Sequence, residues 1–332
     1  MCEEQPILHT PDPNPLTANT ERFRREVLAG LALPQKSLPS KYFYDERGDI
    51  LYNDIMGTSE YYLGRSEIEI FSDRTEALTR AILERHDRFS LIELGPGDVR
   101  KSIYLLSALY LDQVKFTYVP IDISPNVISF LSSSLPESLP GLPIQPMNGE
   151  YLEMLWAFSQ KDPTTPKVLL CLGGNVANMT PAETRKFCRQ LHGCLNPGDM
   201  AIMGFDLKKN PHLIRAAYND RAGITAAFNL NLLTRINREL GADFVTRKFV
   251  HYCHYDPERG SCKSYLVCLE AMDVSIGDTV IHFDKDECIW METSQKYSVP
   301  EINRLAESAG FSVVDNIYDG KKWFADAIWV AD

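Results

Sequence analysis

The sequence lacks any long apolar run, any paired cysteine motif and any excess of positive charge. No apolar stretch approaches the roughly 18–20 residues that a membrane-spanning helix needs. Lysine and arginine number 34 against 45 aspartates and glutamates, which gives a formal net charge of −11. We therefore expect neither a membrane nor nucleic acid as a partner.

Cysteine and histidine also fail to form a metal site. None of the eight cysteines is spaced as a CxxC pair, so zinc-type spacing and a dense disulfide framework are both missing. Cys171, Cys188 and Cys268 stand in apolar contexts and are predicted to be small core residues. His251 and His254 should face opposite sides of a strand, with no acid cluster beside them, so we expect no metal. The first residues lack a signal-peptide pattern, and a reduced, cytoplasmic location is expected.

The chain has 332 residues, 44% of them hydrophobic, which is enough for two core-forming units or one enlarged domain. Short apolar runs alternate with amphipathic stretches that carry helix-capping signals such as Ser124-Pro125 and Thr180-Pro181-x-Glu183. Repeated β-α units of this kind predict an α/β fold with a doubly wound, mostly parallel sheet. The predicted strands are 89–94, 116–121, 167–172 and 201–205.

A different pattern fills residues 206–295. A long helix is predicted over 222–240, with Phe228, Leu232 and Ile236 on one face, followed by short strands. This resembles an α+β insertion, after which strands 311–317 and 324–330 return to the sheet. We predict a cofactor-binding domain at 66–205 and 296–332, a discontinuous substrate-binding domain at 19–65 and 206–295, and a flexible tail at 1–18. The short strands are predicted at 249–255, 264–270, 279–283 and 289–293.

The first predicted strand ends in Gly95-Pro96-Gly97, a strand–turn–helix arrangement typical of nucleotide-binding loops. Arg100 stands where a dinucleotide fingerprint has its third glycine, which counts against NAD or FAD. The loop suits a cofactor without a pyrophosphate, such as S-adenosylmethionine. Glu93 is then expected to meet the cationic half of that cofactor. Asp122, at the end of the next strand, is expected to bind the ribose hydroxyls.

Residues 148–151 are a candidate third contact loop. Glu150 could meet the adenine amino group and Tyr151 could stack on the ring, although a plain surface turn fits the same residues. Spacing alone also leaves open a simple turn at the glycine loop and a helix-capping role for Asp122.

Longer strings are more specific than the glycine loop. Residues 40–48 (SKYFYDERG), 60–67 (EYYLGRSE), 222–231 (AGITAAFNLN), 237–244 (NRELGADF) and 292–296 (ETSQK) are unusual, and they occur in the same order as in a known family. Over roughly residues 20–330 the chain resembles the histidine N-alpha-methyltransferases of ergothioneine biosynthesis. The resemblance implies a Rossmann-like class I methyltransferase domain. It also implies that S-adenosylmethionine trimethylates the α-amino group of L-histidine to give hercynine, the first step toward ergothioneine, and leaves S-adenosylhomocysteine.

The resemblance also implies roles for individual residues. Gly95, Gly97, Lys101 and Asp122 match the family's cofactor contacts, with Glu150 and Tyr151 at the adenine end. On the substrate side, Asn178 holds the amino-acid end, Tyr218 the carboxylate, and Glu292 with Ser294 the imidazole ring. The remaining matches are Tyr61 near the substrate, Tyr52 in an aromatic wall, and Gly173 at the start of the Asn178 loop.

The hydrogen-bonding capacity of the proposed substrate residues agrees with these roles. A carboxylate at 292 can accept a hydrogen bond from one imidazole N–H while Ser294 pairs with the other nitrogen. Asn178 can contact an amine and stay neutral, whereas a carboxylate there would favour the unreactive ammonium.

Some positions depart from the family pattern, namely Gly174 and Asn175 beside the substrate amine, Ser264 in the pocket wall, and Pro96 and Asp98 in the cofactor loop. They keep open methylation of another amino acid or amine, such as tryptophan or tyrosine. A non-catalytic binding protein with the same fold is an alternative of another class. The oligomeric state is left open, and a monomer is compatible with the sequence.

Overall fold

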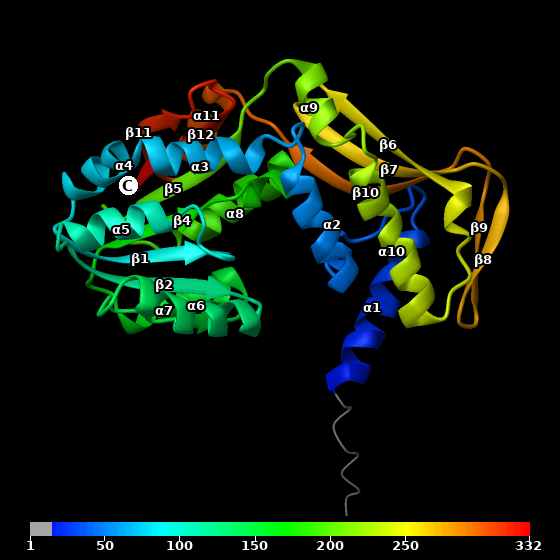
Figure 1. Cartoon of the computed structure of the whole chain (residues 1–332), viewed down its shortest axis with the longest axis horizontal. Helices are drawn as coiled ribbons and strands as arrows, with labels where there is room; N and C mark the ends of the chain where they lie inside the picture. The colour runs from blue at the N-terminus through cyan, green and yellow to red at the C-terminus, as the bar shows by residue number, and fades with distance from the viewer. Residues whose placement is uncertain (1–14) are drawn as a thin grey trace, which may run out of the picture. The chain divides into compact units, whose positions relative to one another are not determined.

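The computed structural model describes residues 15–332, with side chains from residue 19 onward. Its contacts divide the chain into two compact units (Figure 1). The larger unit comprises residues 56–218, 254–262 and 293–332, and the smaller one comprises the described residues up to 55 together with 219–253 and 263–292. Three strands, β6, β7 and β10, run from one unit into the other.

A seven-stranded sheet forms the centre of the larger unit, in the order β11-β12-β5-β4-β1-β2-β3 (Figure 1). Strands β1, β2, β3, β4 and β5 pair in parallel, whereas β12 is antiparallel to both β5 and β11. The predicted α/β fold with a mostly parallel, Rossmann-like sheet is therefore confirmed. The strands are β1 (Arg88–Leu94), β2 (Lys115–Asp122), β3 (Met147–Asn148), β4 (Lys167–Cys171), β5 (Met200–Asp206), β11 (Phe311–Tyr318) and β12 (Phe324–Ala331).

Helices cover both faces of this sheet because its strands alternate apolar side chains between two cores. Phe89 and Leu91 of β1 belong to one core, and Ile92 and Leu94 belong to the other. The first core is completed by α3 (Leu63–Asp73), α4 (Thr75–Leu83), α5 (Ile103–Leu111) and α6 (Pro125–Ser138). The second is completed by α7 (Tyr151–Lys161), α8 (Pro181–His192) and α11 (Val299–Ala309).

Helix ends follow the predicted capping signals. The Thr180 hydroxyl accepts a hydrogen bond from the Glu183 backbone N–H at 3.3 Å, and the Glu183 carboxylate accepts one from the Thr180 N–H at 2.8 Å. At α6 only the first half of this arrangement is present: the Ser124 hydroxyl accepts a hydrogen bond from the Val127 N–H at 3.4 Å. These local contacts fix where α6 and α8 begin, and so fix the loops that precede them.

The smaller unit is α+β. Helix α10 (Ile224–Leu240) buries Phe228, Leu232 and Ile236 as predicted, and α1 packs against it. The Phe43 ring packs against the Phe228 ring in a tilted arrangement, with ring centroids 4.9 Å apart. The helices of this unit are α1 (Pro15–Leu31), η1 (Ser40–Phe43), α2 (Glu46–Gly57, which ends in the larger unit) and η3 (Thr246–Lys248). The strands are β8 (Met272–Ile276) and β9 (Thr279–Phe283), which form a hairpin, and the shared β6 (Phe249–Asp256), β7 (Ser261–Cys268) and β10 (Cys288–Gln295).

Some predicted boundaries differ from the structure. Most of the tail predicted at 1–18 lies outside the described residues, and α1 already begins at Pro15, a residue that suits the first turn of a helix. The strand predicted at 264–270 begins earlier, at Ser261. The contacts also place residues 56–65 and 206–218, including α9 (Pro211–Ala217), in the larger unit. The prediction that Cys171, Cys188 and Cys268 are core residues is confirmed, since all three are buried.

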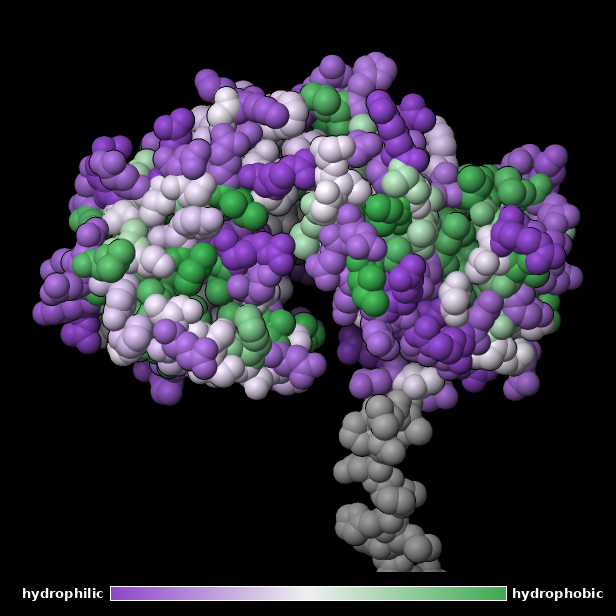
Figure 2. Space-filling view, viewed as in Figure 1, coloured by the Kyte–Doolittle hydropathy of each residue, from purple (hydrophilic) through white to green (hydrophobic). Residues whose placement is uncertain are grey.

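Within residues 15–332, no helix is both long and apolar enough to cross a membrane. The same part of the chain holds no group of three histidine, cysteine or acidic side chains arranged for a metal ion. Figure 2 shows a mixed surface on which hydrophobic residues form small groups among hydrophilic ones.

His251, a buried residue of β6, gives a prediction about acid stability. Its ring is 8% exposed, neither ring nitrogen has a hydrogen-bond partner among the described residues, and burial lowers its pKa to about 4. The unfolded chain takes up the proton near pH 6.5, before the folded chain can, so stability is lost as the pH falls from about 6.5 toward 4. Between pH 7.5 and 5, His251 should cost about 2 kcal/mol of unfolding free energy.

Urea unfolding of the wild type and of His251→Phe at the two pH values measures this cost. The variant should lose less stability on acidification than the wild type does. His254→Gln, at an exposed position of the same strand, is the control and should behave as the wild type. An equal loss in all three proteins would contradict the assignment.

Candidate active site

The glycine loop leaves β1 in a conformation that excludes side chains. Gly95 and Gly97 have φ angles of +67° and +57°, which favour glycine. A Cβ atom at Gly95 would fall 2.4 Å from the hydroxyl oxygen of Tyr151, at the start of α7. The Gly95 N–H also donates to the Ile121 carbonyl at 2.9 Å, which ties the loop to the end of β2. The loop and Tyr151 are thus packed closely together.

Asp122, the last residue of β2, lies beside this loop. Its carboxylate accepts a hydrogen bond from the Ser124 N–H at 2.8 Å and also interacts with the Gly97 backbone N–H. Burial raises the pKa of Asp122 above its ordinary value, while these backbone donors lower it. The Asn148 side chain donates to the Asp122 carbonyl at 2.9 Å, which brings in the third predicted loop. Glu150, the residue before α7, is exposed.

The ends of β1 and β2 therefore gather Gly95, Gly97, Asp122 and Tyr151. In doubly wound sheets this is where ligands bind, outside the carboxyl ends of the strands. The Gly95–Gly97 turn, with the Asp122 carboxylate at its side, fits the adenosyl part of the cofactor that the sequence predicts.

Lys101, another predicted cofactor contact, is held by an acid that the sequence analysis does not predict at the site. Its ammonium lies 2.7 Å from a carboxylate oxygen of Glu67, which is 1% exposed. The Gly173 N–H donates to both oxygens of the same carboxylate, at 2.9 and 3.0 Å. Glu67 therefore connects α3, the cofactor-loop lysine and the loop after β4. Its place in the string 60–67 was the only signal in the sequence.

Two further side chains have hydrogen-bond partners within the protein that the sequence does not predict. Asn175, predicted beside the substrate amine, donates to the Leu94 carbonyl at 3.2 Å and so supports the glycine loop. Glu93, predicted to face the cofactor, is 2% exposed and accepts a hydrogen bond from the Tyr118 hydroxyl at 2.6 Å. Glu93 therefore lies in the core of the unit, and this burial raises the pKa of its carboxyl group.

Three of the predicted substrate residues meet in the larger unit. The hydroxyl oxygens of Tyr218 and Ser294 are 2.6 Å apart, and the Tyr61 ring stands edge-on to the Tyr218 ring at 6.1 Å between centroids. Tyr218 follows α9 and Ser294 lies in β10, so residues far apart in the sequence are brought together. Asn178 closes the short helix η2 (Asn175–Asn178) after β4, where it is exposed.

The Tyr218–Ser294 pair contacts a buried charged network that the sequence does not predict. Lys296 donates to both hydroxyl oxygens at 2.7 Å and to the Asp206 carboxylate at 2.6 Å. Asp206 also pairs with Lys209 and accepts from the Tyr62 hydroxyl at 3.1 Å. Burial lowers the pKa of Lys209 to about 8, although Asp206 opposes the shift. Burial also disfavours the charge of Lys296, but the Asp206 carboxylate keeps its pKa above the ordinary lysine value.

The smaller unit holds Tyr52 and Glu292. Tyr52 lies in an aromatic group with Tyr44 and Phe228, at centroid distances of 5.5 and 6.1 Å. Tyr44 has a raised pKa, first because of burial and then because of negative charges that include Glu292. Glu292 and Ser294 are two residues apart on β10, so the strand pleat places them on the same face. Ser264, a departure from the family pattern, is buried in β7.

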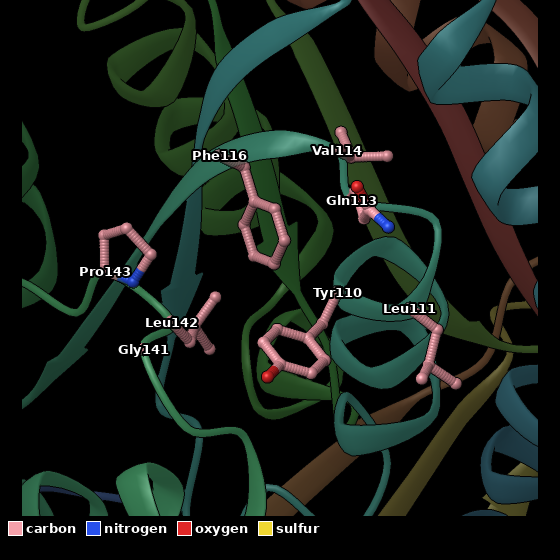
Figure 3. A pocket seen from close by; sticks show the side chains of 8 residues that line it. All are labelled: Tyr110, Leu111, Gln113, Val114, Phe116, Gly141, Leu142 and Pro143. Atoms are coloured by element: carbon pink, nitrogen blue, oxygen red, sulfur yellow. The ribbon is translucent and has the colours of Figure 1, made fainter.

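A pocket of about 430 Å³ lies elsewhere on the larger unit. It is lined by the end of α5, the start of β2 and the loop residues 141–143, at the opposite end of β2 from Asp122 (Figure 3). None of its lining residues is charged, and none is a predicted site residue, so we assign it no part in the chemistry.

Comparison with known proteins agrees with this geometry. A family model described as "Histidine-specific methyltransferase, SAM-dependent" matches residues 23–331. The chain is 33% identical to the histidine N-alpha-methyltransferase of Mycolicibacterium smegmatis, over 87% of this chain and 88% of that one. It is 32% identical to the protein of the same name in Mycobacterium tuberculosis, over 92% and 91% of the two chains. Ergothioneine biosynthesis protein 1 of Schizosaccharomyces pombe is 25% identical, over 85% of this chain and 37% of the longer protein.

Proposed function

Because the chain belongs to the family of histidine-specific, S-adenosylmethionine-dependent methyltransferases, we propose that it methylates the α-amino group of L-histidine. Three transfers give the trimethylated product hercynine, the first intermediate toward ergothioneine. The observation that carries the proposal is the match over residues 23–331, which covers both the glycine loop and the strand with Glu292 and Ser294.

Six residues are proposed to hold the cofactor. Gly95 and Gly97 leave room for its adenosyl part, and Asp122 accepts hydrogen bonds from the ribose hydroxyls. Lys101, fixed by Glu67, provides positive charge for the cofactor's carboxylate. Glu150 and Tyr151 bind the adenine. When bound, S-adenosylmethionine supplies a methyl group already activated by the sulfonium, so these residues contribute by positioning it.

The substrate residues have to bind histidine and keep its amine reactive. The amine attacks only when it is neutral, and Asn178 can hold it without stabilising its charged form. Tyr218 contacts the carboxylate, with Tyr61 beside it. Glu292 and Ser294 bind the two ring nitrogens, while Tyr52 contributes to an aromatic wall and Gly173 begins the Asn178 loop. A pocket whose polar groups need an imidazole rejects side chains that cannot pair with them.

Methylation of a different amino acid or amine is the second candidate. It is favoured by Gly174, Asn175 and Ser264, which differ from the residues usual in the family. An assay of the purified protein with S-adenosylmethionine and a panel of histidine, tryptophan and tyrosine separates the two. We expect a mass gain on histidine alone. A gain on another amino acid without one on histidine would overturn the proposal.

We also propose that the enzyme acts in the cytoplasm, without nucleic acid or a membrane as partner. The net charge of −11 and the buried thiols of Cys171, Cys188 and Cys268 support this. The bound partner is the small-molecule substrate.

A further inference from the structure

Lys296 is fully buried, which is unfavourable for a lysine unless its charge is compensated. It follows β10 and is 0% exposed, and its ammonium contacts the Tyr218 hydroxyl, the Ser294 hydroxyl and the Asp206 carboxylate at 2.6–2.7 Å. Burying an ammonium is costly unless it is paired and fully hydrogen-bonded. Asp206, which is also fully buried, supplies the counter-charge.

Counting hydrogens shows what the lysine does to the two hydroxyls. An ammonium has three donors and no acceptor, and the three contacts of Lys296 use them all. Neither hydroxyl can therefore turn its hydrogen toward the lysine. The 2.6 Å contact between Tyr218 and Ser294 uses one of their two hydrogens. One hydrogen remains, and it is directed away from Lys296.

The pair thus always offers one hydrogen-bond donor to a ligand. If Ser294 donates to Tyr218, the tyrosine O–H is the free donor and suits a carboxylate. Ser294 then keeps one lone pair, which can accept the second N–H of a charged imidazolium ring whose first N–H Glu292 accepts. By fixing this hydrogen-bond pattern, Lys296 couples the orientations of two hydroxyl groups that would otherwise rotate independently.

We propose that Lys296, with Asp206 as its buried counter-ion, is a positioning residue that orients the Tyr218 and Ser294 hydroxyls for substrate binding. The inference rests on the proposed function, in which those two hydroxyls contact the amino-acid substrate. Lys296 itself touches neither substrate nor cofactor.

Lys296→Met removes the donors while keeping a long side chain. It should raise the KM for histidine about 10- to 100-fold, the value of a lost hydrogen bond to a charged group. The affinity for S-adenosylhomocysteine, measured by calorimetry, should stay within about 3-fold, since Asp122 and the glycine loop are untouched. Should Lys296→Met fail to fold, Lys296→Gln is measured instead. Its carbonyl can accept a hydroxyl hydrogen, so the KM should rise in the same way.

Lys167 is a matched control. It is also 0% exposed, and its ammonium lies 3.6 Å from the buried carboxylate of Asp199, at the start of β4. Lys167→Met should lower thermal stability and leave the KM for histidine unchanged. An equal KM change in the Lys167 and Lys296 variants would mean that only general destabilisation is being measured, which overturns the proposal.

A double-mutant cycle tests whether Lys296 acts through the hydroxyls. In the Tyr218→Phe, Ser294→Ala background, Lys296→Met should change the KM less than about 3-fold further. An undiminished effect would overturn the positioning role. If the proposed function is wrong, the wild type fails to methylate histidine; if only the inference is wrong, an active enzyme keeps its KM when Lys296 is replaced.

Discussion

Replacing Glu292 with alanine should lower kcat/KM for histidine about 100- to 1000-fold, while the affinity for S-adenosylhomocysteine changes less than about 3-fold. The carboxylate is the proposed acceptor for one imidazole N–H, and a site built to pair with a polar ligand loses most of its selectivity when that partner is removed. Steady-state kinetics gives the first quantity, and calorimetry gives the second.

Glu270→Ala is the control for this experiment. Glu270 belongs to the same unit, and its exposed side chain pairs with Lys248 on the surface, so its loss should leave both quantities unchanged. A parallel loss of histidine use and cofactor affinity in Glu292→Ala would count against a role in ring recognition.

Replacing Asn178 with aspartate should slow methyl transfer about 100-fold near neutral pH. A carboxylate within a few ångströms raises the pKa of the substrate ammonium by roughly 1–3 units, so less of the bound amine is neutral and able to attack. The rate should recover as the pH rises, because deprotonation of the substrate ammonium is shifted to higher pH and is not abolished. The pH profile of single-turnover methylation, with both substrates saturating, measures this.

Asn178→Ala separates the charge effect from the loss of a contact. Alanine should weaken histidine binding but leave the single-turnover pH profile where the wild type has it. If the aspartate variant also keeps the wild-type profile and changes only the KM, Asn178 does not contact the amine.

The sheet could be predicted from the sequence because each strand is a short apolar run followed by a turn or cap of known chemistry. Thr180 and Ser124 cap their helices as expected, and β1, β2, β4 and β5 lie within one or two residues of prediction. The tyrosine-rich residues 42–65 gave no such signal, yet they contain the second half of η1 and the whole of α2. Their arrangement depends on long-range packing, such as that of Phe43 on Phe228.

The candidate site likewise contains some residues that the sequence predicts and others that it does not. Gly95, Gly97 and Asp122 could be predicted because their spacing along two consecutive strands carries the chemistry. Glu67 and Asp206 could not, since their partners Lys101 and Lys296 come from other elements and no local spacing relates them. Lys296 ends the string that begins at Glu292, and its place in that string was the one local signal in the sequence.

The central claim is that three methyl groups are placed on the α-nitrogen of histidine. The most direct test is tandem mass spectrometry of the product formed from histidine and excess S-adenosylmethionine. We predict that successive one-, two- and three-methyl species appear with every methyl group on the α-nitrogen and an unmodified imidazole ring. Methyl groups on a ring nitrogen, or no methylated histidine at all, would contradict the account.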